Sequence, residues 1–85
     1  MGFKEKVLEV VRRIPKGSVM SYKEVAVAAR NPLAYRAVGN IMKANRDPKV
    51  PCHRVIKSSG EAGGYAFGSR KKTFLLKKEG VNIKA

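Results

Sequence analysis

A break at Asn31-Pro32 between two short helical segments most constrains how this chain folds. Before the break, Ser21 and Glu24 form a capping box, and residues 22–30 are good helix formers. After it, a second helix fits from residue 33 or 34 to Ala44. Two short helices joined by a tight turn predict a helix-turn-helix, although an ordinary helical hairpin has the same length. The apolar side of the second helix carries Ala34, Ala37, Val38, Ile41 and Met42.

Two further helices flank this pair. Apolar residues at helical spacing predict an amphipathic helix over residues 3–13, which Pro15-Lys16-Gly17 ends. Towards the other end, Ser69 is expected to cap a helix that runs through Glu79 and stops at Gly80, with an inward face made of Phe74, Leu75 and Leu76. Extended structure is limited to short pieces near Val19 and Val55. We therefore expect one small, mainly α domain over residues 1–85, with a winged-helix-like helix-turn-helix and at most short β-strands.

The charge of the chain indicates a polyanionic partner. Its 85 residues include 19 Lys and Arg against 6 Asp and Glu, a formal net charge of +13. A basic domain of this size favours nucleic acid, whose condensed counterions are released on binding. A thermally robust, Lys-rich surface is the alternative, but such surfaces usually balance Lys with Glu. Small residues such as Ala37 and Gly39 would let the second helix enter a narrow groove or pack tightly against another helix.

The number of cysteines and the hydropathy of the chain indicate its cellular compartment. The single cysteine, Cys52, cannot form an intramolecular disulfide, and no apolar run approaches the roughly 20 residues of a membrane span. Residues 1–13 intersperse charges among apolar residues, unlike a secretory signal. We therefore expect an intracellular, reducing, cytoplasmic location and no membrane partner.

Reactive chemistry concentrates at residues 51–54 (PCHR), because Cys52 and His53 are the only cysteine and the only histidine. A thiolate is a strong nucleophile when a base or positive charge favours it. Neighbouring side chains on a strand point to opposite faces, so these two cooperate only if the backbone turns or a water bridges them. Glu79 is the acid expected to orient the imidazole, since a helix C-terminus otherwise disfavours a carboxylate. A lone cysteine is also often a small buried hydrophobe, and one Cys with one His makes no metal site.

These motifs, in their order along the chain, resemble those of the catalytic, DNA-binding domain of the O6-alkylguanine-DNA alkyltransferases, also called methylated-DNA-protein-cysteine methyltransferases. The resemblance covers nearly the whole chain. It runs through SYKEVA at 21–26, NPLAYRAVGNIMKAN at 31–45, PCHRVI at 51–56, SSGEAGGYAFG at 58–68 and LLKKEG at 75–80. PCHR followed by a GGY-type loop and a terminal LLxxEG is a specific combination, far beyond what a lone helix-turn-helix supports.

The resemblance implies DNA repair by a suicidal transfer. Cys52 would take the alkyl group from O6 of a guanine flipped out of duplex DNA, and one protein would repair one lesion. His53 would act as the base through a water, and Glu79 would orient His53. Asn45 would tie the second helix to the active-site segment. No cofactor or metal is implied, and we expect the protein to act as a monomer.

The resemblance also implies roles in DNA binding and in the pocket. Tyr22 would help to flip the nucleotide and donate towards the guanine, and Arg36 would fill the vacated place in the base stack. The second helix would lie in the minor groove, with contacts from Ala37, Gly39, Asn40 and Lys43. The carbonyls of Cys52 and Val55 would receive the guanine amino group. The pocket around the guanine and its alkyl group would be lined by Val55, Ser58, Tyr65, Ala66 and Phe67.

Plainer alternatives exist for the single residues and for the whole chain. Tyr22 fits a half-buried helix residue, Arg36 an ordinary basic surface residue and Tyr65 a core aromatic. The alkyltransferase-like proteins bind alkylated DNA without reacting, but they replace the cysteine, typically with tryptophan, whereas this chain has Cys52 and no tryptophan. A small basic architectural protein would explain the charge and leave PCHR unexplained.

The chain departs from the family pattern at several positions. The N-terminal domain of the two-domain members has no counterpart in these residues, so the chain resembles a stand-alone catalytic domain. Arg30 stands where a glycine is common. The short loop before Pro51 carries charges where apolar residues are common, and Ala66 and Phe67 replace small or hydroxyl residues. Phe67 is expected to narrow the pocket against bulky adducts. The charged loop residues are Arg46, Asp47 and Lys49.

Overall fold

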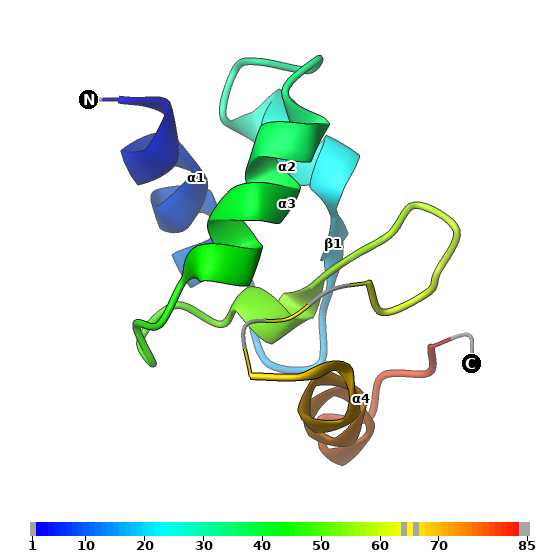
Figure 1. The fold of residues 1–85 in the computed structure, drawn as a ribbon. Coiled ribbons are helices and arrows are strands. Elements are labelled where there is room, and N and C mark those ends of the chain that lie inside the picture. The colour runs from blue at the N-terminus through cyan, green and yellow to red at the C-terminus, as the bar shows by residue number, and fades with distance from the viewer. Residues whose placement is uncertain (1, 64, 66, 84–85) are drawn as a thin grey trace.

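Four α-helices, one short 3-10 helix and two short strands form the part of the chain that the computed structural model describes, residues 2–63, 65 and 67–83 (Figure 1). In chain order they are α1 (Phe3–Arg12), β1 (Met20–Ser21), α2 (Tyr22–Ala28), α3 (Tyr35–Ala44), η1 (Cys52–Arg54), β2 (Val55–Ile56) and α4 (Ser69–Lys78). The expected mainly helical fold with short strands is confirmed. The helix ends lie one or two residues from the expected bounds.

The core lies among α1, α2 and α3, while α4 crosses the opposite end of the molecule (Figure 1). Cys52 and Val55 belong to the same buried cluster, so the segment that follows α3 is anchored in the core. Full burial of an aliphatic side chain contributes roughly 1.5–3 kcal/mol, which makes this helix triplet a firm base for the segment. The residues of α1, α2 and α3 with almost no exposed surface are Val7, Val11, Val25, Ala26, Val38 and Met42.

The two strands bring distant parts of the chain together. β1 and β2 pair in parallel, with Met20 opposite Val55 and Ser21 opposite Ile56. Ser21 also caps α2, because its hydroxyl accepts from the amide of Glu24 at 3.0 Å while the Glu24 carboxylate accepts from the Ser21 amide at 2.9 Å. The expected capping box is therefore confirmed. Since α2 starts directly after β1, this pairing sets Tyr22 beside the segment that carries Cys52.

The turn between α2 and α3 contains a strained residue. Arg30 has φ 67°, in the left-handed region that favours glycine. The amide of Asn31 donates to the carbonyl of Ala26, and the amide of Arg30 to that of Val27, both at 2.9 Å. This pair of bonds is a Schellman motif, in which the left-handed position is usually glycine. The hydrogen bonds of the motif hold the turn although Arg30 lacks the freedom of glycine.

We expect Arg30→Gly to stabilise the fold by about 1 kcal/mol, because glycine adopts this φ without the Cβ penalty. Urea unfolding measures the gain, and Arg30→Ala is the matched control, since alanine loses the long side chain but keeps the Cβ. Equal stability of the glycine and alanine variants would contradict strain at this position.

Two expectations about α4 are wrong. Gly68, at φ 98°, holds the N-cap position in place of Ser69, and no side chain caps this helix. Phe74 is 62% exposed, whereas Lys72 and Leu76 are fully buried. The physical reason is the helical period: residues 72, 75, 76 and 79 share one face, and residue 74 lies about 200° away from 72 and 76. Three consecutive apolar residues cannot all face inward on a helix.

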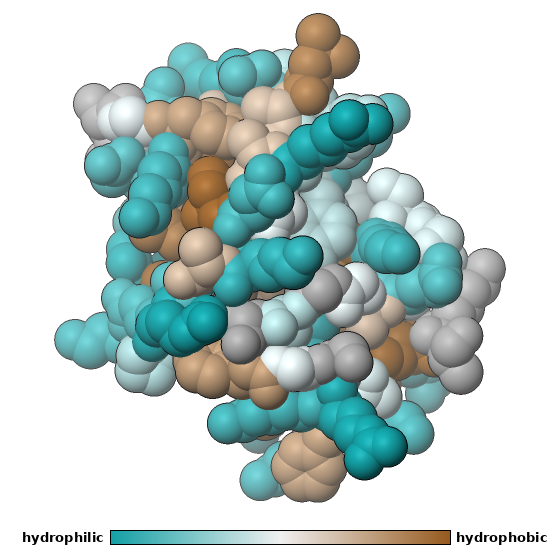
Figure 2. Space-filling model, in the orientation of Figure 1, coloured by the Kyte–Doolittle hydropathy of each residue, from teal (hydrophilic) through white to brown (hydrophobic). Residues whose placement is uncertain are grey.

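Polar and charged side chains are prominent on the face of the molecule that Figure 2 shows. Figure 2 shows hydrophilic side chains over much of one face, with apolar ones scattered between them. Among the described residues, Leu33 and Phe74 are the most exposed large apolar side chains, in the α2–α3 turn and on α4. No helix among the described residues is long and apolar enough to cross a membrane.

Candidate active site

A backbone turn at Cys52 sets the site. The segment Cys52–Arg54 is a 3-10 helix, in which consecutive side chains lie about 120° apart instead of on opposite faces. The turn that cooperation between Cys52 and His53 requires is therefore present. Cys52 is only 2% exposed, and its sulfur accepts a hydrogen bond from the Asn45 side-chain amide at 3.6 Å. Asn45 is the C-cap of α3, so its hydrogen bond joins the end of that helix to the cysteine.

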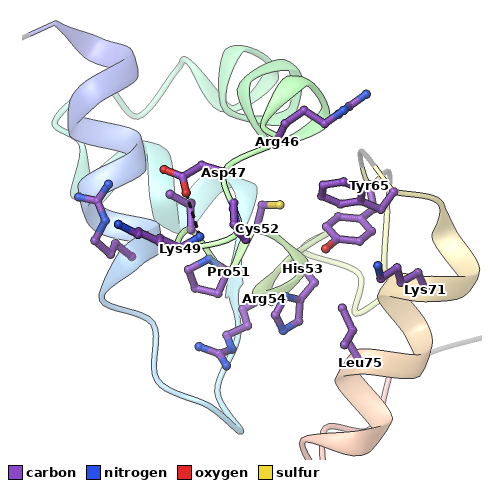
Figure 3. Close-up of a pocket in the computed structure, with 14 residues that line it drawn as sticks. Arg46, Asp47, Lys49, Pro51, Cys52, His53, Arg54, Tyr65, Lys71 and Leu75 are labelled. Carbon is purple, nitrogen blue, oxygen red and sulfur yellow. Dashed lines mark hydrogen bonds between the residues drawn. The ribbon is translucent and has the colours of Figure 1, made fainter.

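A cavity of about 670 Å³ opens beside Cys52 (Figure 3). The Cys52 sulfur and the Tyr65 hydroxyl point towards each other across it. Burial, and then the charge and hydrogen bond of Cys52, raise the pKa of Tyr65 above its ordinary value. Tyr65 meets the His53 ring edge-on at 6.4 Å between centroids, and the Phe67 ring at 5.4 Å. The expected pocket residues Tyr65 and Phe67 therefore gather at the cysteine, while Ala66 lies outside the described residues.

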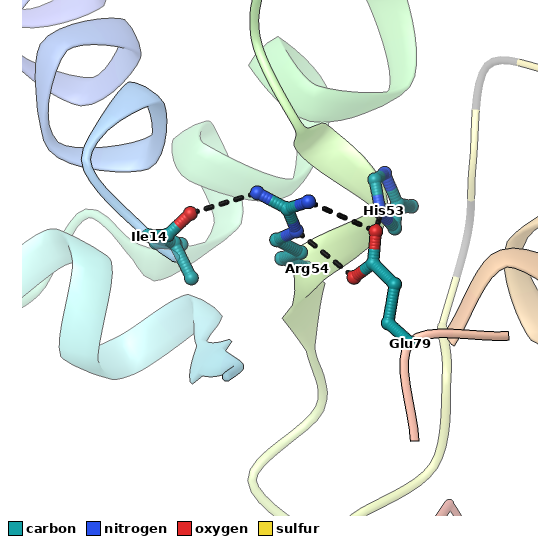
Figure 4. A network of polar contacts seen from close by, with 4 residues as sticks. All are labelled: Ile14, His53, Arg54 and Glu79. Atoms are coloured by element: carbon teal, nitrogen blue, oxygen red, sulfur yellow. Dashed lines mark hydrogen bonds and ion pairs between the residues drawn. The ribbon is translucent and has the colours of Figure 1, made fainter. Parts of the chain in front are cut away.

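His53, Arg54 and Glu79 form a polar network behind the cavity (Figure 4). His53 Nε2 lies 2.9 Å from Glu79 Oε2, and Arg54 donates to both carboxylate oxygens, from Nε at 3.0 Å and Nη2 at 2.9 Å. Arg54 Nη1 donates to the Ile14 carbonyl at 2.9 Å, which ties the network to the end of α1. The Glu79 side chain is 10% exposed. Glu79 therefore contacts His53, the residue it is expected to orient.

The network fixes the ionisation of Glu79 and the tautomer of His53. Hydrogen bonding from Arg54, then from His53, lowers the pKa of Glu79 to about 2 against burial, which raises it. The carboxylate is thus ionised near neutral pH and accepts hydrogen bonds only, so Nε2 carries the proton that His53 donates to it. Nδ1 is left as the basic nitrogen of the neutral ring. Arg54 also explains how a carboxylate is tolerated at the C-cap of α4.

Sequence reasoning missed Lys72, which lies fully buried on the inner face of α4. Its Nζ donates to the Val55 carbonyl at 2.6 Å and to the Tyr22 hydroxyl at 3.3 Å. Burial lowers the pKa of Lys72 to about 8, although the charge of Cys52 opposes that shift. Its spacing could have predicted this burial, because Lys72 shares a helix face with Leu76 and Glu79.

We expect the stability contribution of Lys72 to rise with pH. An unfolded lysine titrates near 10.5 and the folded one near 8, so the unfolded state binds more protons between these values and folding is favoured as pH rises through them. Between pH 7.5 and 10, the unfolding free energy of the wild type should rise by about 2 kcal/mol relative to that of Lys72→Met. Urea titrations at both pH values measure the gain. A difference independent of pH would show that Lys72 has no depressed pKa.

Tyr22 and Gly63 contact each other close to Cys52 but outside the cavity at its sulfur. Burial, and then the charge of Cys52, raise the pKa of Tyr22, which is half-buried at the start of α2. A Cβ added at Gly63 would lie 2.7 Å from the Tyr22 hydroxyl, and Gly63 has φ 77°. The position therefore needs glycine both for its conformation and for the close approach of Tyr22. Its place in a Gly-rich loop was the only sequence signal.

The remaining expected site residues lie on other surfaces or below the site. Tyr22 and Ser58 line a separate recess of about 380 Å³ with Tyr35 and Lys57. Val55 is buried, and its carbonyl accepts from Lys72. Ala37 is half-buried on α3. The solvent-facing stripe of α3 is made of Arg36, Gly39, Asn40 and Lys43.

The fold and the site together define a class: small helix-turn-helix proteins that set a buried cysteine beside a histidine–carboxylate pair. Residues 2–81 match the family model described as 6-O-methylguanine DNA methyltransferase, DNA binding domain. The chain belongs to this family. The expected resemblance is thereby confirmed.

Two curated relatives show how close the match is. The chain is 46% identical over 85 residues to methylated-DNA-protein-cysteine methyltransferase of Methanosarcina barkeri, covering 96% of this chain and 52% of the relative. It is 47% identical over 79 residues to the human protein of the same name, covering 92% of this chain and 37% of the relative. The chain thus spans about half or less of the length of these relatives.

Two solved structures share the fold. Mycobacterium tuberculosis OGT in complex with DNA superposes with a TM-score of 0.88 at 40% identity, covering 94% of this chain and 49% of that one. S. pombe Atl1 in complex with damaged DNA containing O6-carboxymethylguanine superposes with a TM-score of 0.85 at 35% identity, covering 96% of this chain and 79% of that one. The chain therefore resembles proteins of both names.

Proposed function

We propose that this protein repairs duplex DNA by transferring the alkyl group of O6-methylguanine irreversibly to Cys52. The observation that carries the proposal is the contact of His53 Nε2 with an ionised Glu79, one residue along the same 3-10 helix from a cysteine whose sulfur faces a cavity. A carboxylate side chain that orients an imidazole next to a thiol is the arrangement typical of an activated nucleophile. We also propose that the protein acts as a monomer in the cytoplasm, without metal or cofactor.

In the proposed reaction, the Cys52 thiol first loses its proton. His53 Nδ1 accepts it through a water, because the sulfur points towards Tyr65 rather than towards the imidazole (Figure 3). The carboxylate of Glu79 stabilises the imidazolium that forms. The thiolate then attacks the alkyl carbon, so that a sulfur–carbon bond forms and the carbon–O6 bond breaks with its electron pair on the guanine. The thioether is not hydrolysed, which limits each protein to one transfer.

Tyr22 and Lys72 serve the departing base in this proposal. Lys72 donates to the Tyr22 oxygen, and the Tyr22 hydroxyl in turn donates towards the guanine as the base departs. The Val55 carbonyl accepts from Lys72 but has a second lone pair, which is available to the guanine amino group together with the Cys52 carbonyl. Tyr65 and Phe67, which line the cavity at Cys52, enclose the alkyl group, and Ser58, from the separate recess beside Tyr22, contacts the base.

We propose that α3 lies in the minor groove of the DNA. Its solvent-facing stripe combines the small Gly39 with Arg36, Asn40 and Lys43, so the helix backbone can approach the groove while cations meet phosphates. Ala37 adds to the small surface at its edge. Arg36 fills the place of the guanine once the base is flipped out, and Tyr22 drives the flip.

A second candidate function is binding of alkylated DNA without transfer. The observation that favours it is the likeness to S. pombe Atl1, at a TM-score of 0.85 and 35% identity. Against it stand the presence of Cys52 itself and the hydrogen bond from Asn45 to its sulfur. We therefore favour the transfer reaction.

Titration separates the two functions. A fixed amount of duplex carrying one O6-methylguanine is mixed with increasing amounts of protein, and restored guanine is counted by nucleoside chromatography. The transfer reaction predicts one guanine restored per protein, with no further repair when more duplex is added. Saturable binding with no restored guanine would contradict transfer and support the binding function.

A further inference from the structure

Cations line the cavity at Cys52 on both sides, and one of them, Lys49, lies on the side away from Tyr65 (Figure 3). Asp47 is the one acid among the described residues that line it, and it lies on the opposite side of Cys52 from Tyr65 (Figure 3). On the Tyr65 side, towards which the sulfur points, stand Arg46 and Lys71. Two other cations of the lining are already committed, Arg12 to Glu9 and Arg54 to Glu79. The alkyl group of a substrate would therefore face Arg46 and Lys71.

Phe67 holds these two cations in place. The Arg46 guanidinium lies 5.4 Å from the centre of the Phe67 ring, and the Lys71 ammonium lies 5.3 Å from it. Phe67 itself packs edge-on against Tyr65. Arg46 is further held by the Lys43 carbonyl at 3.2 Å, at the end of α3. Cation–π contacts of this kind fix a charge without neutralising it.

The charges of Arg46 and Lys71 are not balanced by acids. Within the described part of the chain, neither residue lies in an ion pair, and the first turn of α4, which carries Lys71, contains no acid. Glu61, on the same loop as Tyr65, is occupied by the Ser59 hydroxyl at 2.9 Å. Two fixed and uncompensated cations thus stand beside the cavity that opens at the sulfur.

From this arrangement we infer that the site is suited to anionic O6 adducts, and that Arg46 and Lys71 act as specificity-determining residues for a carboxylate on the alkyl group. The inference rests on the proposed transfer to Cys52. O6-carboxymethylguanine is the simplest such substrate, because its carboxylate lies one bond beyond the carbon that the sulfur attacks.

The physical need for these cations is specific to an anionic adduct. A carboxylate next to the attacked carbon repels the incoming thiolate, and nearby positive charge offsets this repulsion most in the transition state, where the two negative groups are closest. The step balances as for a methyl group: the sulfur–carbon bond forms, the carbon–O6 bond breaks with its electron pair on the guanine, and S-carboxymethylcysteine remains. The same cations also favour the Cys52 thiolate, but that effect is common to every adduct and cancels when two adducts are compared.

The competing role for Arg46 and Lys71 is contact with DNA phosphates, which would act on every lesion alike. The test therefore compares two adducts of nearly equal shape in the same duplex, O6-carboxymethylguanine and its neutral amide counterpart, O6-carbamoylmethylguanine. Single-turnover rate constants are measured for both, and their ratio cancels the common contribution of the DNA backbone. Transfer of methyl from O6-methylguanine is measured in parallel.

We expect Lys71→Gln to lower the ratio of carboxymethyl to carbamoylmethyl rates about fivefold, Arg46→Gln to lower it similarly, and Lys71→Arg to restore most of it. Lys77→Gln, which removes an exposed charge elsewhere on α4, is the matched control and should leave the ratio unchanged. An unchanged ratio in Lys71→Gln and Arg46→Gln would overturn the inference and assign both cations to the DNA backbone. Transfer of methyl but of neither larger adduct would overturn it too, while absence of methyl transfer would contradict the proposed function itself.

Discussion

We expect the Cys52→Ala variant to bind duplex DNA but to leave O6-methylguanine intact. The sulfur is the only thiol of the chain, so no other side chain can accept the alkyl group as a thioether. The solvent-facing stripe of α3, which we propose meets the DNA, does not include Cys52, so binding should persist within about threefold of the wild-type Kd. Loss of one buried sulfur costs about 1 kcal/mol of stability, which the folded state tolerates. Gel-shift binding and restored guanine are measured on the same samples.

Cys52→Ser is the matched control for size. Serine keeps the hydrogen bond from Asn45, but its hydroxyl ionises far less readily than a thiol, so transfer should fall below detection there as well. Repair that survives in either variant would contradict the role of Cys52 as acceptor. Loss of binding together with repair would instead show that the variant is unfolded, which circular dichroism distinguishes.

Glu79→Gln should have the second-largest effect, slowing transfer by about 100-fold. The amide leaves Arg54 without its carboxylate partner and no longer stabilises an imidazolium on His53. Because the Glu79 side chain is only 10% exposed, the broken pair should also cost about 2–3 kcal/mol of stability. Single-turnover rates are measured well below the unfolding temperature, so that the kinetic effect is separate from unfolding.

The stability effect of Glu79→Gln should depend on pH. The folded carboxyl has a pKa of about 2, below its ordinary value of 4.5, so its contribution is present above pH 4.5 and is lost as pH falls towards 2. Wild type and Glu79→Gln should therefore converge in stability at low pH. Glu9→Gln is the control, because its ion pairs with Arg12 and Arg13 are exposed and contribute less than about 1 kcal/mol. Identical behaviour of the two variants would contradict a special role for Glu79.

Local sequence signals predicted the scaffold well. The Ser21–Glu24 box, the Asn31-Pro32 break and the Gly80 stop are short-range features whose chemistry depends little on the rest of the fold. Glu79 was singled out because an acid at a helix C-terminus requires a partner, and the structure supplies two in His53 and Arg54.

Features that depend on packing between distant segments were missed. Lys72 is buried because α4 packs across η1 and β2, where its ammonium meets the Val55 carbonyl 17 positions away. Gly63 is required by the ring of Tyr22, which no local pattern reveals. Arg54 donates to both carboxylate oxygens of Glu79, 25 positions away, a pairing that no local pattern reveals. The error at Phe74 is different, because strict use of the helical period would have avoided it.

Peptide mapping by mass spectrometry tests directly whether Cys52 accepts the methyl group. The protein is incubated with a duplex that contains one O6-methylguanine and is then digested, and the peptide with Cys52 is compared with that from protein kept with unmodified duplex. We expect one added methyl group, located on the Cys52 sulfur, in an amount equal to the guanine restored. Restored guanine without a methyl group on Cys52, or a methyl group on any other residue, would contradict this expectation.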